Sequence, residues 1–163
     1  MRLISIVLLL LTTLAGLHRG LMCRDEHYKP VDWFIALRMN SGDTSKRIYL
    51  VLTNLNKSWY FADETELMVP LLNQVDFTKH KGAVWNDQPP GKSVSETFAH
   101  DKGMLFFNPS DKTGFHMTHS VPLFPNILGD KIDPITNLAS DYGQSFICIS
   151  VRTKANAVMQ QIY

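Results

Sequence analysis

The sequence places an imidazole and an ammonium group two residues apart, at His100 and Lys102. Alternate residues of a β-strand point to the same face, so an extended segment here would present both side chains together. A lysine can hold the anionic oxygens of a phosphate, and a neutral histidine can attack phosphorus or move a proton. The triplet therefore indicates phosphate chemistry. His-x-Lys also occurs by chance, and an exposed polar strand end is the alternative.

Two further histidines, His116 and His119, follow in the same stretch. Residues three apart on a strand face opposite sides, and no cysteine or clustered carboxylate completes a metal site. We therefore expect no metal here. His119 is expected to meet His100 across a hairpin, and His116 is expected to be a structural histidine of the sheet.

The residues between these histidines predict the hairpin itself. An apolar run, Met104–Phe107, is followed by a polar turn at Asn108–Gly114 and by a second strand that ends near His119. A polar cluster at Asn86–Pro90 ends an earlier strand. Asp87 in that cluster is a candidate to orient a histidine, and a turn held by its own side-chain hydrogen bonds is the alternative.

The rest of the chain predicts several strands and few helices. Strands are expected at residues 31–39, 47–53, 82–88 and 145–151, where β-branched and aromatic residues gather. A helix is expected from Pro70 to about Phe77. Asp63 with Glu66 resembles a capping box, but Pro70 would interrupt a longer helix. The pattern indicates a mixed α/β or α+β sheet domain.

Two segments and one residue type complete these expectations. Residues 122–134 are expected to form a proline-rich loop, and residues 155–163 begin a helical pattern. Trp33, Trp59 and Trp85 are expected to lie mainly in the core.

The first 20 residues predict a secretory signal peptide. Arg2 supplies a positive start, Leu3–Leu11 is almost unbroken aliphatic, and small residues follow up to Gly20. A retained membrane anchor is the alternative, but the apolar run is short for a bilayer span. We therefore expect residues 1–20 to be removed and residues 21–163 to form one domain.

The net charge and the cysteines bear on how the chain could bind phosphate and on the compartment in which it folds. The net charge is +1, from 16 basic and 15 acidic residues, so phosphate binding must come from local placement rather than bulk charge. Cys23 and Cys148 are the two cysteines, and an even count in a secreted chain suggests a disulfide; two buried free thiols are the alternative. Asn56 begins a glycosylation sequon and should lie on an exposed turn if it is used.

Five short motifs, in this order, resemble those of the deoxyribonuclease II family. They are Val31–Phe34, Asn86–Pro90, His100–Gly103, His119–Pro125 and Tyr142–Phe146. Each motif alone is unspecific, but the set is specific and covers essentially the whole expected domain.

The resemblance implies a fold similar to the phospholipase D superfamily, a β-sheet flanked by helices in which two related halves meet at one active site. It implies acid, metal-independent hydrolysis of DNA phosphodiesters with no cofactor, in a secreted or lysosomal setting. One histidine acts as nucleophile through a phosphohistidine, a second acts as general acid, and the products carry a 3′-phosphate. Opposite protonation states of two histidines at mildly acidic pH agree with that mechanism.

The resemblance also implies roles for individual residues. By position, His100 and Lys102 match the first His-x-Lys of the family, and His119 matches a further family histidine. Candidates for supporting roles are Asp87, Gln88 and Asn108. The two cysteines, Cys23 and Cys148, match a family disulfide.

This chain is expected to supply only the N-terminal half, with the first His-x-Lys half-site. Ala99 precedes His100 where the family usually has glycine, and Asn108 stands where an acidic residue is expected. A homodimer or a missing C-terminal half would complete the site. The alternative is a catalytically inactive secreted relative that binds nucleic acid or serves another interaction role.

Overall fold

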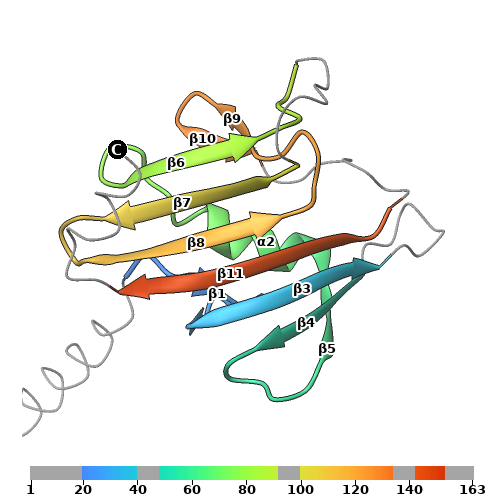
Figure 1. The fold of residues 1–163 in the computed structure, drawn as a ribbon. Coiled ribbons are helices and arrows are strands. Elements are labelled where there is room, and N and C mark those ends of the chain that lie inside the picture. Colours follow the sequence, from blue (N-terminus) through green and yellow to red (C-terminus); the bar gives the residue numbers. More distant parts are fainter. Residues whose placement is uncertain (1–19, 40–47, 92–99, 134–141, 153–163) are drawn as a thin grey trace, which may run out of the picture.

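A computed structural model describes residues 20–39, 48–91, 100–133 and 142–152. Its main feature is a seven-stranded antiparallel sheet in the order β5-β4-β3-β11-β8-β7-β6 (Figure 1). The strands are β3 (Trp33–Met39), β4 (Ile48–Thr53), β5 (Tyr60–Asp63), β6 (Lys81–Asn86), β7 (Lys102–Asn108), β8 (Thr113–His119) and β11 (Gln144–Arg152). The last of these, β11, occupies the centre, between β3 and β8.

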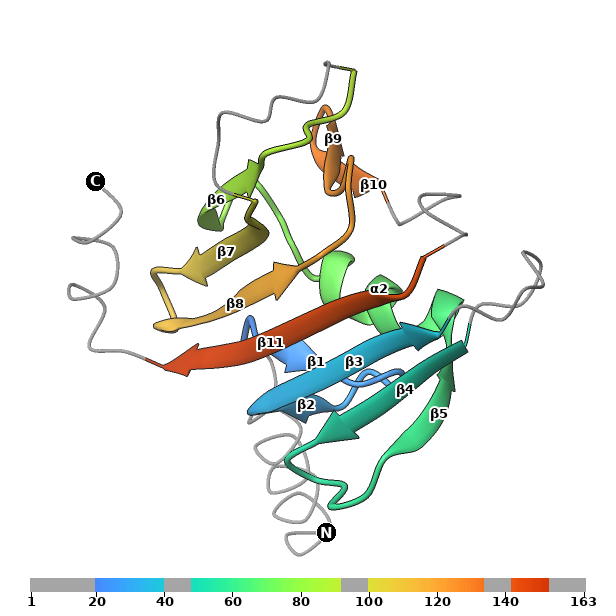
Figure 2. The same ribbon diagram turned by 45° about the vertical axis from the view of Figure 1, so that its right-hand side comes forward.

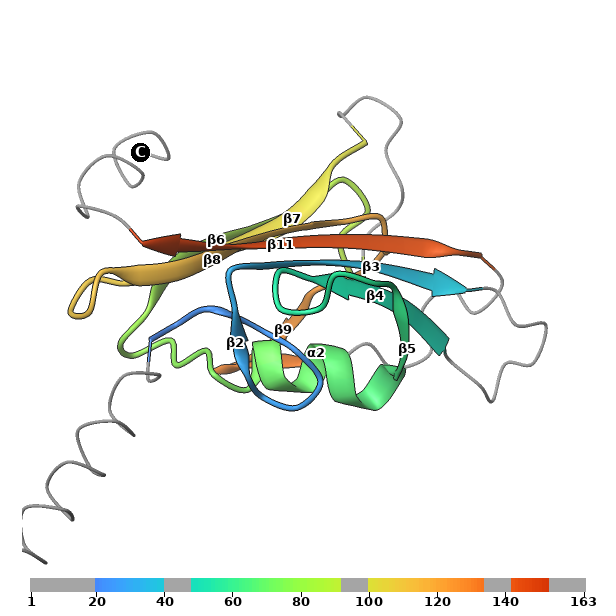
Figure 3. The same cartoon turned by 90° about the horizontal axis from the view of Figure 1, so that it is seen from below.

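Three smaller elements accompany the sheet. Two antiparallel ribbons pair β1 (Cys23–Arg24) with β2 (Pro30–Val31) and β9 (Asn126–Leu128) with β10 (Lys131–Asp133). The helix α2 (Glu64–Leu72) runs behind β11 and β3 (Figure 2). Seen edge-on, α2, β2 and β9 all lie on one side of the sheet, which we call the inner face (Figure 3).

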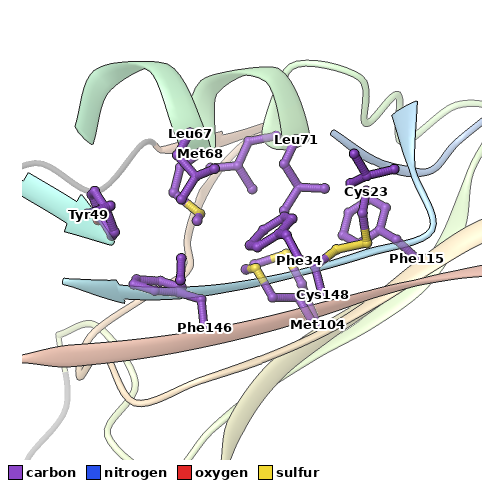
Figure 4. Close-up of a cluster of buried hydrophobic side chains, with 14 of the residues drawn as sticks. Cys23, Phe34, Tyr49, Leu67, Met68, Leu71, Met104, Phe115, Phe146 and Cys148 are labelled. Carbon is purple, nitrogen blue, oxygen red and sulfur yellow. A yellow bond between two sulfur atoms is a disulfide. The ribbon is translucent and has the colours of Figure 1, made fainter. Parts of the chain in front are cut away.

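Strand alternation explains the inner face. On β3, Phe34 and Ala36 are fully buried, whereas Trp33 before them and Leu37 after them are exposed. The same alternation on β11 buries Phe146 and Cys148. These side chains pack against Leu67, Met68 and Leu71 of the helix and form the core (Figure 4).

The predicted disulfide is confirmed. Cys23 of the first ribbon is bonded to Cys148 of the central strand, and 125 residues separate them in the sequence. Both cysteines are fully buried, and Figure 4 shows the bond within the apolar cluster. The bond therefore ties the start of the described chain to the middle of the sheet.

The sheet predictions hold with small shifts at the ends, and the hairpin is confirmed as β7 and β8. The strand expected at 82–88 ends at Asn86, so Asp87 lies just beyond it. The loop expected over residues 122–134 was wrong in part, because it contains β9 and β10. The predicted helical pattern at 155–163 lies outside the described residues, as does nearly all of the predicted signal peptide.

The helix prediction was wrong in its bounds. The helix begins at Glu64, in agreement with the capping-box alternative, and Pro70 lies inside it. Proline in a helix interior costs about 3 kcal/mol through a lost hydrogen bond and a clash. Burying Leu67, Met68 and Leu71 contributes about 1.5–3 kcal/mol for each side chain, which is more than that cost.

The face opposite α2, which we call the outer face, exposes large apolar side chains on β3, β4, β5 and β11. The exposed large side chains that strand alternation places there are Trp33, Leu37, Met39, Ile48, Phe61, Ile147 and Ile149. The expectation that the tryptophans lie in the core was therefore wrong, since Trp33 and Trp59 are exposed and Trp85 is partly exposed. Within the described ranges, no helix is both long and apolar enough to cross a bilayer.

Removing the disulfide tests how much of this fold depends on it. A Cys23→Ala/Cys148→Ala variant should lose about 2–5 kcal/mol of unfolding free energy, because the bond closes a long loop in the unfolded chain. Urea titrations with and without reductant measure the loss. The wild type should move to the variant's midpoint under reductant, and an unchanged midpoint would contradict the prediction.

Candidate active site

One carboxylate, that of Asp87, holds both members of the His-x-Lys triplet. Its Oδ1 lies 2.5 Å from Lys102 Nζ, and its Oδ2 lies 2.8 Å from His100 Nδ1. The Asp87 and Lys102 side chains are only 5% and 1% exposed, whereas the His100 side chain is 77% exposed. The geometry is thus a buried ion pair with an imidazole at its open end.

The register of two strands brings these residues together. Asn86, the last residue of β6, pairs with Lys102, the first residue of β7. Asp87 follows at once, and its N–H donates to the carbonyl of Asp101 over 3.3 Å. His100 precedes β7, so the expectation that strand alternation aligns His100 with Lys102 was wrong. The shared carboxylate aligns them instead.

The charges around Asp87 decide its protonation state. Burial acts to raise the pKa of this carboxyl group, but the hydrogen bond and charge of Lys102, together with those of His100, outweigh it. The net pKa is lowered. Asp87 is therefore an anion that accepts from both partners, and an Nδ1–H donated by His100 leaves its Nε2 lone pair toward solvent.

His119 has a different environment at the end of β8. It is 8% exposed, and its ring contacts Phe124 and Phe146 at centroid distances of 5.0 Å and 6.1 Å. Burial lowers its pKa to about 4, and the positive charge of Lys102 acts in the same direction. The Val121 N–H donates to Nδ1 over 3.2 Å. We therefore assign neutral His119 its proton on Nε2.

His100, Lys102 and His119 line one small cavity of about 220 Å³. The other lining residues are Asp101, Thr118, Ser120, Ser145 and Ile147. His119 Nε2 is buried and has no hydrogen-bond partner among the residues that the structure describes. A phosphate-sized anion in this cavity would meet the Lys102 charge and the His119 donor. In the described ranges, no three His, Cys, Asp or Glu side chains gather as a metal site.

Polar contacts fasten the end of β8 to the start of β11. The Ser120 hydroxyl donates to Gln144 Oε1 over 2.5 Å and accepts from the Ser145 N–H over 2.9 Å. The Ser120 N–H donates to the Ser145 carbonyl over 3.0 Å. Ser120 and Ser145, which belong to two of the sequence motifs, therefore line the cavity. The sequence alone gave neither serine a role.

The other candidates do not reach the cavity. Asn108 is at the far end of β7, six residues from Lys102 and so about 20 Å along the strand. It binds Asp111 and the Ser110 N–H in the hairpin turn. Gln88 accepts the Leu123 N–H through its backbone carbonyl, which ties two loops together. Neither residue lines the cavity, and their supporting roles stay predictions.

Two sequence features away from the cavity are also resolved. Asn56 is exposed in the turn between β4 and β5, as its sequon requires, and its glycosylation stays a prediction. The sequence contains a second His-x-Lys triplet at His27–Lys29. The expectation of a single His-x-Lys half-site overlooked it. The structure places it in the turn between β1 and β2, with Asp25 Oδ1 accepting both the His27 and Lys29 N–H groups. Neither side chain lines the cavity.

A histidine and a lysine held by one carboxylate beside a buried imidazole define a site suited to phosphate esters. The family comparison agrees, because the sequence model of Deoxyribonuclease II matches residues 22–163. The chain belongs to the deoxyribonuclease II family.

Similar proteins include the Deoxyribonuclease-2-alpha of Rattus norvegicus, which is 29% identical over 149 residues, or 81% of this chain and 42% of the relative. The Cell-death-related nuclease 7 of Caenorhabditis elegans is 27% identical, over 82% of this chain and 38% of its own length. The Deoxyribonuclease-2-alpha of Bos taurus is 30% identical, over 87% and 43%. The chain thus spans about 40% of the length of the curated relatives it matches.

The Asp87–Lys102 pair can be tested by stability. Asp87→Asn leaves a buried ammonium without its counter-charge and should cost about 3–5 kcal/mol of unfolding free energy. Asp87→Asn/Lys102→Met should recover most of that loss, because no buried charge remains. Urea unfolding at pH 7 measures both. The exposed Asp130→Asn is the matched control and should change little; equal losses in the single and double variants would oppose the prediction.

His119 predicts a pH dependence of stability. Its pKa is about 4 in the folded chain and about 6.5 when unfolded, so the unfolded state binds the proton first as pH falls. This contribution to stability is complete above pH 6.5 and is lost toward pH 4, by about 2–3 kcal/mol. His119→Gln should flatten the stability profile between pH 7 and 4.5, measured by urea unfolding. The exposed His27→Gln should keep the wild-type slope.

Proposed function

We propose that this chain contributes the first half-site of an acid, metal-independent endodeoxyribonuclease, with His100 as the nucleophile. The observation that carries the proposal is the Asp87 carboxylate, which accepts from His100 Nδ1 and pairs with the buried Lys102. Membership of the deoxyribonuclease II family supports it. DNA is the proposed substrate, and no cofactor takes part.

In the proposed reaction, His100 Nε2 attacks the phosphorus atom of a phosphodiester in the cavity. The P–N bond forms as the bond to the 5′ oxygen breaks, and that oxygen takes a proton from a general acid. Water then hydrolyses the phosphohistidine and releases a 3′-phosphate. Asp87 keeps the His100 tautomer that attacks, since its Oδ2 accepts the Nδ1 proton.

Lys102 and His119 serve the phosphate oxygens in this proposal. The Lys102 ammonium supplies charge from the cavity wall, and the buried Nε2–H of His119 supplies a neutral donor. A pKa of about 4 keeps His119 neutral at mildly acidic pH, so it is unsuited to be the general acid there. That acid comes from the second half-site, either in a C-terminal half or in a second copy of the chain.

The setting belongs to the same proposal. Residues 1–20 act as a signal peptide, residues 21–163 form the half-domain, and Asn56 carries a glycan. The buried Cys23–Cys148 bond supports a secreted or lysosomal location, because disulfides persist in oxidising compartments.

A second candidate is a catalytically inactive family member that binds nucleic acid. The observation that favours it is that one cavity already offers a phosphate group the Lys102 cation and the His119 donor, which are sufficient for binding. Such a protein would use the same cavity as a phosphate anchor without bond cleavage. The two functions therefore differ in turnover and not in binding.

The test is plasmid nicking at pH 5 in excess chelator. Wild-type protein should cut, and His100→Ala should reduce the rate at least about 1,000-fold because the attacking atom is gone. The exposed His27→Ala is the matched control and should cut at the wild-type rate. DNA binding without cutting by a dimer of the chain supports the inactive alternative, and a requirement for magnesium or calcium overturns the histidine mechanism.

A further inference from the structure

Trp85 lies on the outer face of the sheet beside the catalytic cavity. It is opposite Gly103 in the β6–β7 pairing, and Gly103 is in turn opposite Thr118 of β8. This row leads to Ile147 of β11, which is exposed on the outer face. The indole is therefore on the side away from α2, where it does not contribute to the core cluster.

Three contacts hold the indole in one position. Its Nε1–H donates to Asp101 Oδ2 over 2.9 Å. Its ring lies over Gly103, where any Cβ would overlap it, so the glycine lets the indole cross β7. Beyond the glycine it stacks on the His116 ring at a centroid distance of 5.6 Å and an interplanar angle of 26°. A large aromatic surface is thus ordered before any ligand arrives.

Trp85 and His116 do not line the cavity themselves, but they contact or adjoin residues that do. Asp101, which accepts the indole N–H, lines that cavity, and so does Thr118, the neighbour of Gly103. Trp85 and His116 are both partly exposed. The nucleoside attached to a phosphate in the cavity would therefore lie near this aromatic surface, because Gly103 under the indole is the neighbour of Lys102 in the cavity wall.

We propose that Trp85 and His116 form a stacking platform for one unpaired nucleobase of the strand whose phosphate occupies the cavity. The inference deepens the proposed function and rests on it. Bases stack on aromatic side chains with little regard to sequence, because every base has a π-face. The platform selects single-stranded or locally opened nucleic acid, since a paired and stacked base does not present its face.

The alternative is that the indole only fills the space over Gly103. A filler would make no distinction between strands with and without bases. A platform would bind base-bearing strands more tightly by about 5-fold to 150-fold, the range that stacking of a single base covers.

The test compares two fluorescent hexanucleotides with the same number of phosphates, one thymine-bearing and one abasic. Binding is followed by anisotropy at pH 7.5 in chelator, where the proposed acid cleavage is slow. Wild-type protein should bind the thymine-bearing strand more tightly by the stated factor. Trp85→Ala should bring the ratio close to one while the abasic affinity stays within about twofold, and Trp85→Phe should keep most of the ratio.

The exposed Trp59→Ala is the matched control and should leave the ratio unchanged. A ratio that persists in Trp85→Ala, or a ratio of one in the wild type with abasic binding intact, overturns the platform and leaves the phosphate site standing. If neither strand binds the wild type, the proposed function fails and the platform fails with it.

A second measurement covers a Trp85→Ala variant that does not fold. Trp33→Phe/Trp59→Phe leaves Trp85 as the only indole of the chain. Its fluorescence should be quenched by the thymine-bearing strand and not by the abasic strand. Equal quenching by both strands, or none by either, overturns the platform.

Discussion

The candidate site depends on one buried charge pair. A lysine ammonium that is 1% exposed is costly to bury unless an anion lies against it, and Asp87 is that anion. Because Asp87 is also almost fully enclosed, the ends of β6 and β7 must keep the register that joins them. The second carboxylate oxygen remains available, and His100 uses it. The position and tautomer of the exposed His100 imidazole thus follow from the need of the buried Lys102 for a counter-charge.

Strand alternation places successive side chains of β7 on opposite faces of the sheet. Lys102 points to the inner side, where the ion pair and His119 lie, while Gly103 opens the outer side to the indole of Trp85. Residues of both faces line the cavity, since Ile147 and Thr118 belong to the outer face. In the proposed platform, a phosphate group and the base of the same nucleotide would therefore meet neighbouring residues of one strand.

The two histidines of the cavity differ because their surroundings differ. His100 is largely exposed and bound to a carboxylate, whereas His119 packs between Phe124 and Phe146 near the Lys102 charge. Desolvation lowers the pKa of His119 to about 4, so this imidazole is neutral at mildly acidic pH. In the proposed mechanism, His119 therefore donates a hydrogen bond and His100 is the nucleophile. The general acid of that proposal is neither of them.

Local patterns in the sequence were enough to predict the strands and the β7–β8 hairpin, because alternation and turn residues are short-range signals. The disulfide was predicted from the number of cysteines. The triplet at His100 and Lys102 was identified from residue type and spacing. Local patterns failed at Pro70, where burial of one helix face outweighs a local penalty. They also failed at Trp85, which strand alternation places on the outer face, where Gly103 leaves room for the indole over β7. Asn108, a candidate for a supporting role, lies at the end of β7 opposite to Lys102. Asp87 was a candidate to orient a histidine, but its contacts with both His100 and Lys102 were decided by tertiary structure alone, as was the lowered pKa of His119. Desolvation and charge pairing depend on neighbours that are distant in the chain, and only folding brings those neighbours into contact.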